Sequence, residues 1–148
     1  MQEKYDTFIT GYLECRSYLP ANPEFLIIQP VGCHDIAILD DQIEWMMKNT
    51  TSSFNLTVVK VNDWNKELSP WEAPAVFGDQ SFGSGAEDTL SLMISELIPG
   101  IRKRYETGNI PVILGGYSLA GLFSLWSSYQ TDSFSAIAAV SPSVWFPE

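Results

Sequence analysis

The chain has 148 residues, of which 45% are hydrophobic and 18% are charged; this composition fits a single folded domain and excludes a disordered chain. Its formal net charge of −10 argues against binding to nucleic acid or to an anionic membrane surface, because both need a basic patch. Two cysteines, Cys15 and Cys33, are too few for a disulfide framework or a zinc site. With no signal-peptide pattern and no long apolar stretch, we expect a cytoplasmic protein with reduced thiols.

The first half of the chain alternates between predicted strands and one predicted helix. Residues 7–19 indicate one or two strands, and the apolar run at 24–31 indicates a buried strand. Apolar residues spaced by three and four over 35–49 predict an amphipathic helix, with Asp35 as a candidate N-cap. The β-branched run at 55–61 predicts a further strand.

The second half continues this alternation. Residues 85–106 are acidic at the start and basic at the end, as is typical of a helix, and Pro99-Gly100 is predicted to bend or break it. Strands that alternate with helices predict an α/β domain, with a mostly parallel sheet covered on both faces. The remaining expected elements are a strand at 110–116, a helix at 119–130 and a strand at 134–142.

One segment, residues 62–84, has neither a helical nor a strand period. It is rich in proline, glycine and aromatic residues, and so long a connection is uncommon in a compact domain. It begins at the carboxyl end of a predicted strand, where open α/β sheets bind ligands. Two interpretations are open: its rings, Trp64 and Trp71 among them, line a binding site, or they only tether the loop to its own domain.

The stretch GYSLA, residues 116–120, joins a predicted strand to a predicted helix. A serine at such a turn matches the nucleophile elbow G-x-S-x-G, here with alanine in the last place. The nucleophile of an elbow has a strained backbone, and larger side chains two residues before or after it would collide with neighbouring backbone. Gly121 lets the helix pack close to the strand, and the Leu119 N–H at the helix start can point at an oxyanion.

Two other interpretations of this stretch stay open. Gly116 and Gly121 match the ends of the dinucleotide fingerprint G-x-G-x-x-G, but Ser118 replaces the central glycine that lets a pyrophosphate approach the backbone. The stretch could also be a structural turn that carries no chemistry.

LGGYSLAGLFSLW and AAVSPSVWF resemble the putative-esterase branch of the α/β-hydrolase superfamily, which includes esterase D (S-formylglutathione hydrolase) and feruloyl, acetylxylan and siderophore esterases. FLIIQPVGCHDI is similar to the strand and oxyanion turn of this branch, and DWNKELSPWEAPAVFG to a loop of its small bacterial members. The resemblance covers essentially the whole chain and implies a three-layer α/β-hydrolase-type fold without the C-terminal strand–helix units. It implies hydrolysis of a small-molecule carboxylic ester through an acyl-serine, with no metal and no cofactor.

Position by position, the resemblance makes Ser118 the nucleophile and the Leu119 N–H the first oxyanion donor. The second donor would come from Val31 or Gly32, although Pro30-Val31 stands where the family often has His-Gly. The residues expected to line the cleft and bind substrate are Trp64, Trp71, Tyr117 and Trp145, together with Ser141, Pro142, Ser143 and Phe146.

The catalytic base is the main departure from the family. In this fold the triad follows the order serine, acid, histidine, but no histidine follows Ser118. Of the two later acids, Asp132 lies in a connection at the wrong end of the sheet and Glu148 is the last residue. His34 lies in the predicted oxyanion turn, where it could act as a substitute base or simply orient that turn. Because a serine without a base is a poor nucleophile, we expect the chain alone to be inactive.

Three interpretations follow from this departure. The residues could be the N-terminal part of a longer hydrolase, a pseudoenzyme that binds an ester or sugar ligand, or a short flavodoxin-like binding domain. Residues 134–140 are apolar on both faces, as in a strand inside a sheet, and carry no charge or proline. As a sheet edge they would promote self-association.

Overall fold

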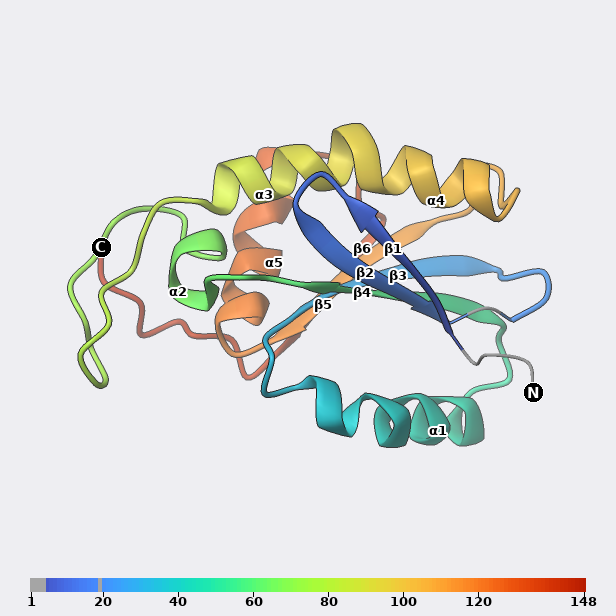
Figure 1. Cartoon of the computed structure of the whole chain (residues 1–148), viewed down its shortest axis with the longest axis horizontal. Helices are drawn as coiled ribbons and strands as arrows, with labels where there is room; N and C mark the ends of the chain where they lie inside the picture. Colours follow the sequence, from blue (N-terminus) through green and yellow to red (C-terminus); the bar gives the residue numbers. More distant parts are fainter. Residues whose placement is uncertain (1–4, 19) are drawn as a thin grey trace.

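The computed structural model describes residues 5–18 and 20–148, which form one six-stranded sheet with helices on both faces (Figure 1). The expected strands are all present; the N-terminal segment forms two, and its last expected residue, 19, lies outside the described residues. The strands are β1 (Tyr5–Thr10), β2 (Leu13–Tyr18), β3 (Phe25–Val31), β4 (Phe54–Lys60), β5 (Val112–Tyr117) and β6 (Ala136–Val140). The helical segments are η1 (Ile36–Ile38), α1 (Leu39–Asn49), α2 (Trp64–Glu67), α3 (Ala86–Leu92), η2 (Met93–Leu97), α4 (Ile98–Arg104) and α5 (Leu119–Gln130).

The sheet is mixed, with the order β1-β2-β4-β3-β5-β6. The β1–β2 and β2–β4 pairs are antiparallel, while β4, β3, β5 and β6 run parallel to one another. In the centre, Ile27 of β3 lies opposite Leu56 of β4 and Ile113 of β5. The carboxyl ends of the four parallel strands therefore all lie at the same end of the sheet, which is where α/β folds bind ligands.

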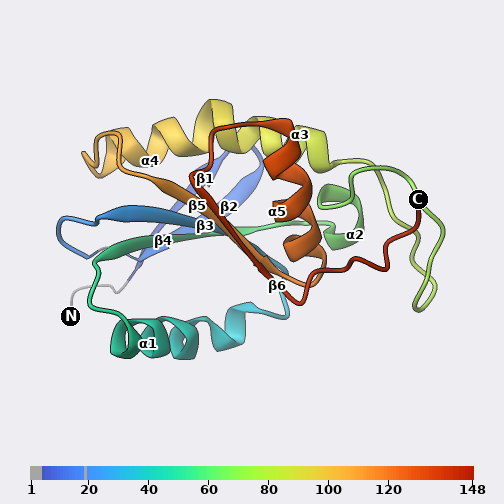
Figure 2. The same cartoon turned by 180° about the vertical axis from the view of Figure 1, so that it is seen from behind.

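Helices cover the sheet on two sides, as Figures 1 and 2 show: α1 packs on one face, and α3, α4 and α5 lie on the other. Side chains of β4 are buried on both faces of the sheet: Leu56 and Val58 lie in the core beneath α1, and Val59 lies in the larger core on the opposite face. This arrangement confirms the three layers predicted from the alternation of elements. In the described part of the chain, no helix has the length and apolar character that a membrane span needs.

The helix expected over residues 35–49 begins later than predicted. A turn of 3₁₀-helix, η1, comes first, and α1 starts at Leu39. Asp35 precedes η1, but its side chain makes no capping bond; instead, Asp35 Oδ2 accepts a hydrogen bond from the Gly32 N–H at 3.0 Å. The carboxylate thus closes the turn after β3 rather than capping the helix.

The helix expected over residues 85–106 does not break at Pro99-Gly100. It runs through α3, η2 and α4, and Pro99 lies in the first turn of α4. The irregularity comes earlier, in the π-helical turn η2, where the Ile98 N–H bonds to the Met93 carbonyl five residues back. A proline lacks an N–H and collides with the carbonyl four residues before it, and the wider turn relieves that conflict.

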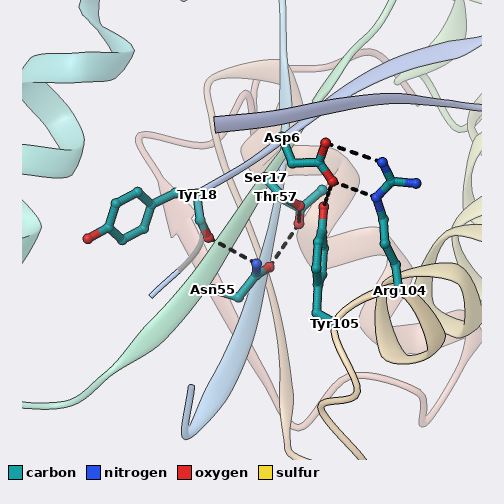
Figure 3. Close-up of polar contacts among 7 residues, drawn as sticks. All are labelled: Asp6, Ser17, Tyr18, Asn55, Thr57, Arg104 and Tyr105. Carbon is teal, nitrogen blue, oxygen red and sulfur yellow. Dashed lines mark hydrogen bonds and ion pairs between the residues drawn. The ribbon is translucent and has the colours of Figure 1, made fainter. Parts of the chain in front are cut away.

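The β1 edge of the sheet is tied to α4 by charged and polar side chains (Figure 3). Asp6 Oδ2 accepts hydrogen bonds from Arg104 Nε at 2.5 Å and from the Tyr105 hydroxyl at 2.8 Å. The bond from Arg104, followed by that from Tyr105, lowers the pKa of Asp6 below its usual range. These bonds hold the N-terminal hairpin against the end of the helix.

Buried polar side chains lie behind this ion pair, between β2 and β4. The Ser17 and Thr57 hydroxyls are 2.5 Å apart, and Thr57 donates to Asn55 Oδ1 at 2.9 Å. The Asn55 side chain in turn donates to the Tyr18 carbonyl at 3.0 Å, as Figure 3 shows. Each of these groups therefore has a partner, as buried polar groups require.

In the described part of the chain, the β6 edge carries no comparable polar cover. The sequence pattern of β6 is that of an interior strand, yet the structure places it last in the sheet. Ala136, Ala138 and Val140 are exposed on one face, and Val140 retains 56% of its accessible surface. Strand order and exposure thus leave an uncharged, apolar strand at one side of the described fold.

Candidate active site

Ser118 lies at the turn between β5 and α5, with φ +59° and ψ −119°. A positive φ at a residue other than glycine is uncommon and costly, and it marks a backbone that the surrounding structure holds in place. A Cβ atom added to Gly116 would lie 2.6 Å from the carbonyl carbon, carbonyl oxygen and Cβ of Ala120. The predicted strand-to-helix turn is therefore present, and it needs the small residues that the sequence supplies.

The segment after β6 holds the main chain of Ser118. The Ser118 N–H donates to the Val140 carbonyl at 3.0 Å, and the Ser143 N–H donates to the Ser118 carbonyl at 3.1 Å. Gly121 allows this approach, because a Cβ there would lie 3.1 Å from Cα of Pro142 and 3.2 Å from the Gly116 carbonyl oxygen. Ser118 is thus fixed from both the helix side and the β6 side.

The hydroxyls of Ser118 and Ser143 are 3.2 Å apart. Ser143 is buried, whereas Ser118 keeps partial exposure. The predicted oxyanion donor Leu119 is the first residue of α5, where N–H groups have no partner within the helix. A helix N-terminus is also the positive end of the helix dipole, which favours negative charge close to Ser118.

The turn after β3 holds the two other predicted oxyanion donors. Val31 is the buried last residue of β3, and Gly32 follows it. The Gly32 N–H is committed to the Asp35 carboxylate in this conformation, so it could serve an oxyanion only after that bond opens. A Cβ on Gly32 would lie 2.5 Å from the His34 ring and 3.2 Å from the Trp64 ring, so both rings pack against this turn.

His34 lies on the surface of this turn, with 61% of its side chain exposed. Its Nε2 is 3.3 Å from Asp35 Oδ2, and its ring meets the Trp64 ring edge-on at 5.2 Å. Neither of these contacts involves Ser118. Of the later acids, Asp132 is exposed between α5 and the amino end of β6, at the opposite end of the strand from Ser118, and Glu148 is exposed after the aromatic residues that follow β6.

The segment 62–84 contains structure that its composition did not predict. Helix α2 forms one turn, in which Asp63 Oδ1 accepts from the Lys66 N–H at 3.1 Å and the Glu67 carboxylate accepts from the Asp63 N–H. The sequence does indicate this helical turn, because the N-cap residue Asp63 is followed four residues later by Glu67, close to the usual capping-box spacing. Further along, Ala73 and Phe82 form an antiparallel bridge.

Five rings join the end of this loop to the segment after β6. Trp71 and Phe146 lie 5.6 Å apart, as measured between ring centroids, and Phe77 and Trp145 lie 5.0 Å apart. Phe82 contacts both rings of the C-terminal segment, and the Trp71 indole N–H donates to the Pro147 carbonyl at 2.7 Å. We call these rings the aromatic clamp; its members are Trp71, Phe77, Phe82, Trp145 and Phe146.

The clamp contains two of the tryptophans expected to bind substrate, and both are partly open to solvent: Trp71 is 44% exposed and Trp145 45%. Trp64 lies elsewhere, against His34 and the turn after β3. The contacts support the tethering interpretation of the loop, and a substrate-binding role of the open ring faces stays a prediction.

Tyr117 lies beside a different hollow. A cavity of about 410 Å³ between α1 and the sheet is lined by Gly116, Tyr117 and Val140, with Gln29, Gln42 and Met46 among its other lining residues. It reaches the elbow through the two residues that precede Ser118, and Ser118 itself is not part of its lining. Among the described residues, no group of three or more histidine, cysteine or acidic side chains is placed to hold a metal ion.

Solved structures with this architecture include a serine hydrolase, siderophore hydrolases and esterases. The chain superposes on an IroE-like serine hydrolase from Shewanella oneidensis with a TM-score of 0.80 and 17% identity, covering 96% of this chain and 52% of that one. For the BES protein from Bacillus cereus the TM-score is 0.76 at 16% identity, covering 99% and 66%. For the siderophore hydrolase EstA from Aspergillus nidulans it is 0.72 at 15% identity, covering 98% and 59%. No curated protein matches the sequence.

These likenesses define the class of fold: the chain has an α/β-hydrolase-type fold and spans 52–66% of the length of those three structures. Residues 38–147 match the protein family described as "Putative esterase". The match covers most of the chain, including Ser118 and the aromatic loop, although it leaves out the turn after β3. The chain therefore belongs to this esterase family, as the resemblance implied.

Proposed function

We propose that Ser118 is the nucleophile of a carboxylic-ester hydrolase that works through an acyl-serine. The observation that carries the proposal is the left-handed φ of +59° at a serine between a strand and a helix, held by the contact of Gly116 with Ala120. In the first step Ser118 Oγ bonds to the ester carbonyl carbon, its proton passes to a base, and the alcohol leaves with a proton returned from that base. Water then hydrolyses the acyl-serine.

The charge that develops on the carbonyl oxygen would be stabilised at the start of α5. The Leu119 N–H is the proposed first donor, and Val31 or Gly32 is the proposed second. Either donor would have to reorient: Val31 belongs to the β3–β4 ladder, where its carbonyl accepts from the Val61 N–H at 3.0 Å, and the Gly32 N–H is bonded to Asp35. The proposed substrate is a small-molecule ester, whose apolar part would contact Trp71, Trp145 or Tyr117, while Trp64 borders the turn after β3.

Among the described residues, the contacts of Ser118 include no base. The sequence has no histidine after Ser118, and the described contacts of His34 are with Asp35 and Trp64. We therefore propose that these 148 residues alone do not turn over esters and that an efficient reaction needs a base from outside them. The same observation favours a second candidate function, a non-catalytic protein that binds an ester or sugar ligand at this cleft.

Acylation of a thiol placed at the elbow separates these two functions, because a thiolate attacks without a separate base. The Ser118→Cys variant is treated with p-nitrophenyl acetate, and the acetylated peptides are quantified by mass spectrometry. We expect acetylation at position 118 to be at least about tenfold faster than at Cys33, since the proposed oxyanion donors would serve an acyl group attached at position 118. Cys33 is exposed and serves as the control within the same molecule. Equal rates at the two thiols would favour the non-catalytic function.

We further propose that the chain self-associates through β6, and that it is cytoplasmic, with Cys15 and Cys33 both free thiols. From Phe134 to Val140 the strand carries no charge and no proline. The net charge of −10 is therefore carried elsewhere and does not oppose close approach at this edge. The test of the self-association is given with the other predictions below.

A further inference from the structure

Ser143 stands out as the buried polar group nearest to the proposed nucleophile. It retains 1% of its accessible surface, and its hydroxyl oxygen lies 3.2 Å from that of Ser118. Within the described residues, the Ser143 hydroxyl has one hydrogen-bond partner, the hydroxyl of Ser118. A buried hydroxyl needs a partner, so the Ser143 side chain depends on this contact.

The backbone around Ser143 is built to hold that contact. Its N–H donates to the Ser118 carbonyl at 3.1 Å, so the two residues are joined through both main chain and side chain. Ser141, two residues earlier, has φ +43°, and Pro142 packs within 3.1 Å of the position that a Cβ of Gly121 would take. The turn at 141–143 therefore packs closely against the start of α5. This packing restricts movement of the Ser143 hydroxyl away from Ser118.

We infer that Ser143 is a positioning residue that donates a hydrogen bond to the oxygen of Ser118, holding it in its attacking position and stabilising its anionic form. This inference rests on the proposed role of Ser118. The direction of the bond follows from the chemistry: the Ser118 proton must stay available to a base, so Ser143 supplies the proton between the two oxygens. An anionic nucleophile accepts such a bond more strongly than a neutral one does.

The test measures the pKa of a thiol at position 118, which needs no esterase activity. In a Ser118→Cys, Cys33→Ser background, the rate of alkylation by iodoacetamide is followed against pH by intact-protein mass spectrometry. The remaining Cys15 stays silent near neutral pH, because burial raises the pKa of its thiol to about 11. Titratable side chains at the carboxyl end of the parallel strands include His34 and Asp35 after β3, Asp63 and Glu67 after β4, and Tyr117 on β5, and all variants keep them. Cys33, in the turn after β3, is replaced in every variant alike.

Adding Ser143→Ala to this background is expected to raise the midpoint of the alkylation profile by about half to one pH unit, the worth of one hydrogen bond. Near pH 7 the alkylation rate would fall roughly three- to tenfold. The matched control is Ser124→Ala, which removes another buried hydroxyl, one that bonds within α5 to the Ala120 carbonyl at 2.8 Å. We expect it to leave the midpoint unchanged.

Circular dichroism checks that each variant is folded. Ser143→Gly serves as a second variant without the hydroxyl, and both Ser143 variants keep the N–H that bonds to the Ser118 carbonyl. An unshifted midpoint in either folded Ser143 variant overturns the inference, as does an equal shift in Ser124→Ala. These outcomes are separate from the acylation test of the proposed function. Position 118 can be acylated selectively while Ser143 has no influence on its pKa, and the reverse can also hold.

Discussion

The two edges of the sheet are held in different ways. At the β1 edge, the carboxylate of Asp6 receives hydrogen bonds from Arg104 and Tyr105, so polar pairing fastens the hairpin to α4. At the β6 edge, next to Ser118, the turn depends on close contacts of Gly116 and its neighbours and on main-chain hydrogen bonds. The Ser118 turn is thus stabilised by close packing, which added atoms disrupt. The hairpin is stabilised by an ion pair, which is weakened by solvent screening and by protonation of its carboxylate.

The largest effect is expected at Gly116. The Gly116→Ala substitution places a methyl group 2.6 Å from backbone and side-chain atoms of Ala120, so β5 and α5 must move apart. We expect the free energy of unfolding to fall by about 2–4 kcal/mol, as measured by urea denaturation. Gly100→Ala is the matched control: nothing lies within 4 Å of its Cβ position in α4, and alanine should raise stability there by about 0.5–1 kcal/mol. Equal effects of the two substitutions would contradict the steric account.

A smaller effect is expected at the other edge. Asp6→Ala removes the partner of Arg104 and Tyr105, and it should lower the free energy of unfolding by about 1 kcal/mol at pH 7, since these groups are partly exposed. The folded state lowers the pKa of Asp6, so this stabilisation is present above pH about 4, the unfolded value, and is lost as pH falls through the folded pKa.

Urea denaturation of the original chain and of Asp6→Ala at pH 7 and near pH 3 measures this dependence. The difference between them should be largest at pH 7 and shrink in acid. Asp132→Ala, at an exposed position outside these contacts, controls for the loss of a carboxylate. A difference that grows in acid would show that Asp6 is not held as an ion.

The smallest effect on stability is expected at β6. Ala138 is exposed on this strand, and Ala138→Lys should change the free energy of unfolding by less than about 0.5 kcal/mol. A lysine on an edge strand opposes pairing with another strand, so the variant should sediment as a monomer at concentrations where the original chain forms larger species. Ser128→Lys, at an exposed position of α5, adds the same charge away from the edge and should leave the association unchanged. If both lysines act alike, net charge rather than β6 governs association.

The comparison also separates what local sequence predicts from what it cannot. The Ser118 turn was predictable because its tightest contact, between Gly116 and Ala120, joins residues four positions apart. The aromatic clamp was not, since Trp71 and Phe146 are far apart in sequence and only the fold brings them together. Of the expected bend or break at Pro99-Gly100, the break was wrong, because the π turn at Met93–Leu97 absorbs the conflict and sequence periodicity does not reveal such a turn.

The role expected of Asp35 was wrong for a similar reason. An aspartate just before a helix usually caps it, but here the nearby Gly32 N–H takes the carboxylate first. The sequence places Val31 and Gly32 at the end of β3 and the start of the turn that follows it. It does not show which of their N–H groups are already hydrogen-bonded. Likewise Ser143 could be placed in the cleft, while its contact with the Ser118 hydroxyl depends on how the β6 segment folds back.

Steady-state hydrolysis of p-nitrophenyl acetate by the unmodified chain, by Ser118→Ala and by His34→Ala tests most directly the claim that these residues hold a positioned nucleophile without its base. The account predicts the same background rate for all three proteins, because the described residues that contact Ser118 include no base. Turnover by the unmodified chain that Ser118→Ala abolishes would contradict this claim. If His34→Ala abolished it as well, His34 would be the base that the described contacts do not show.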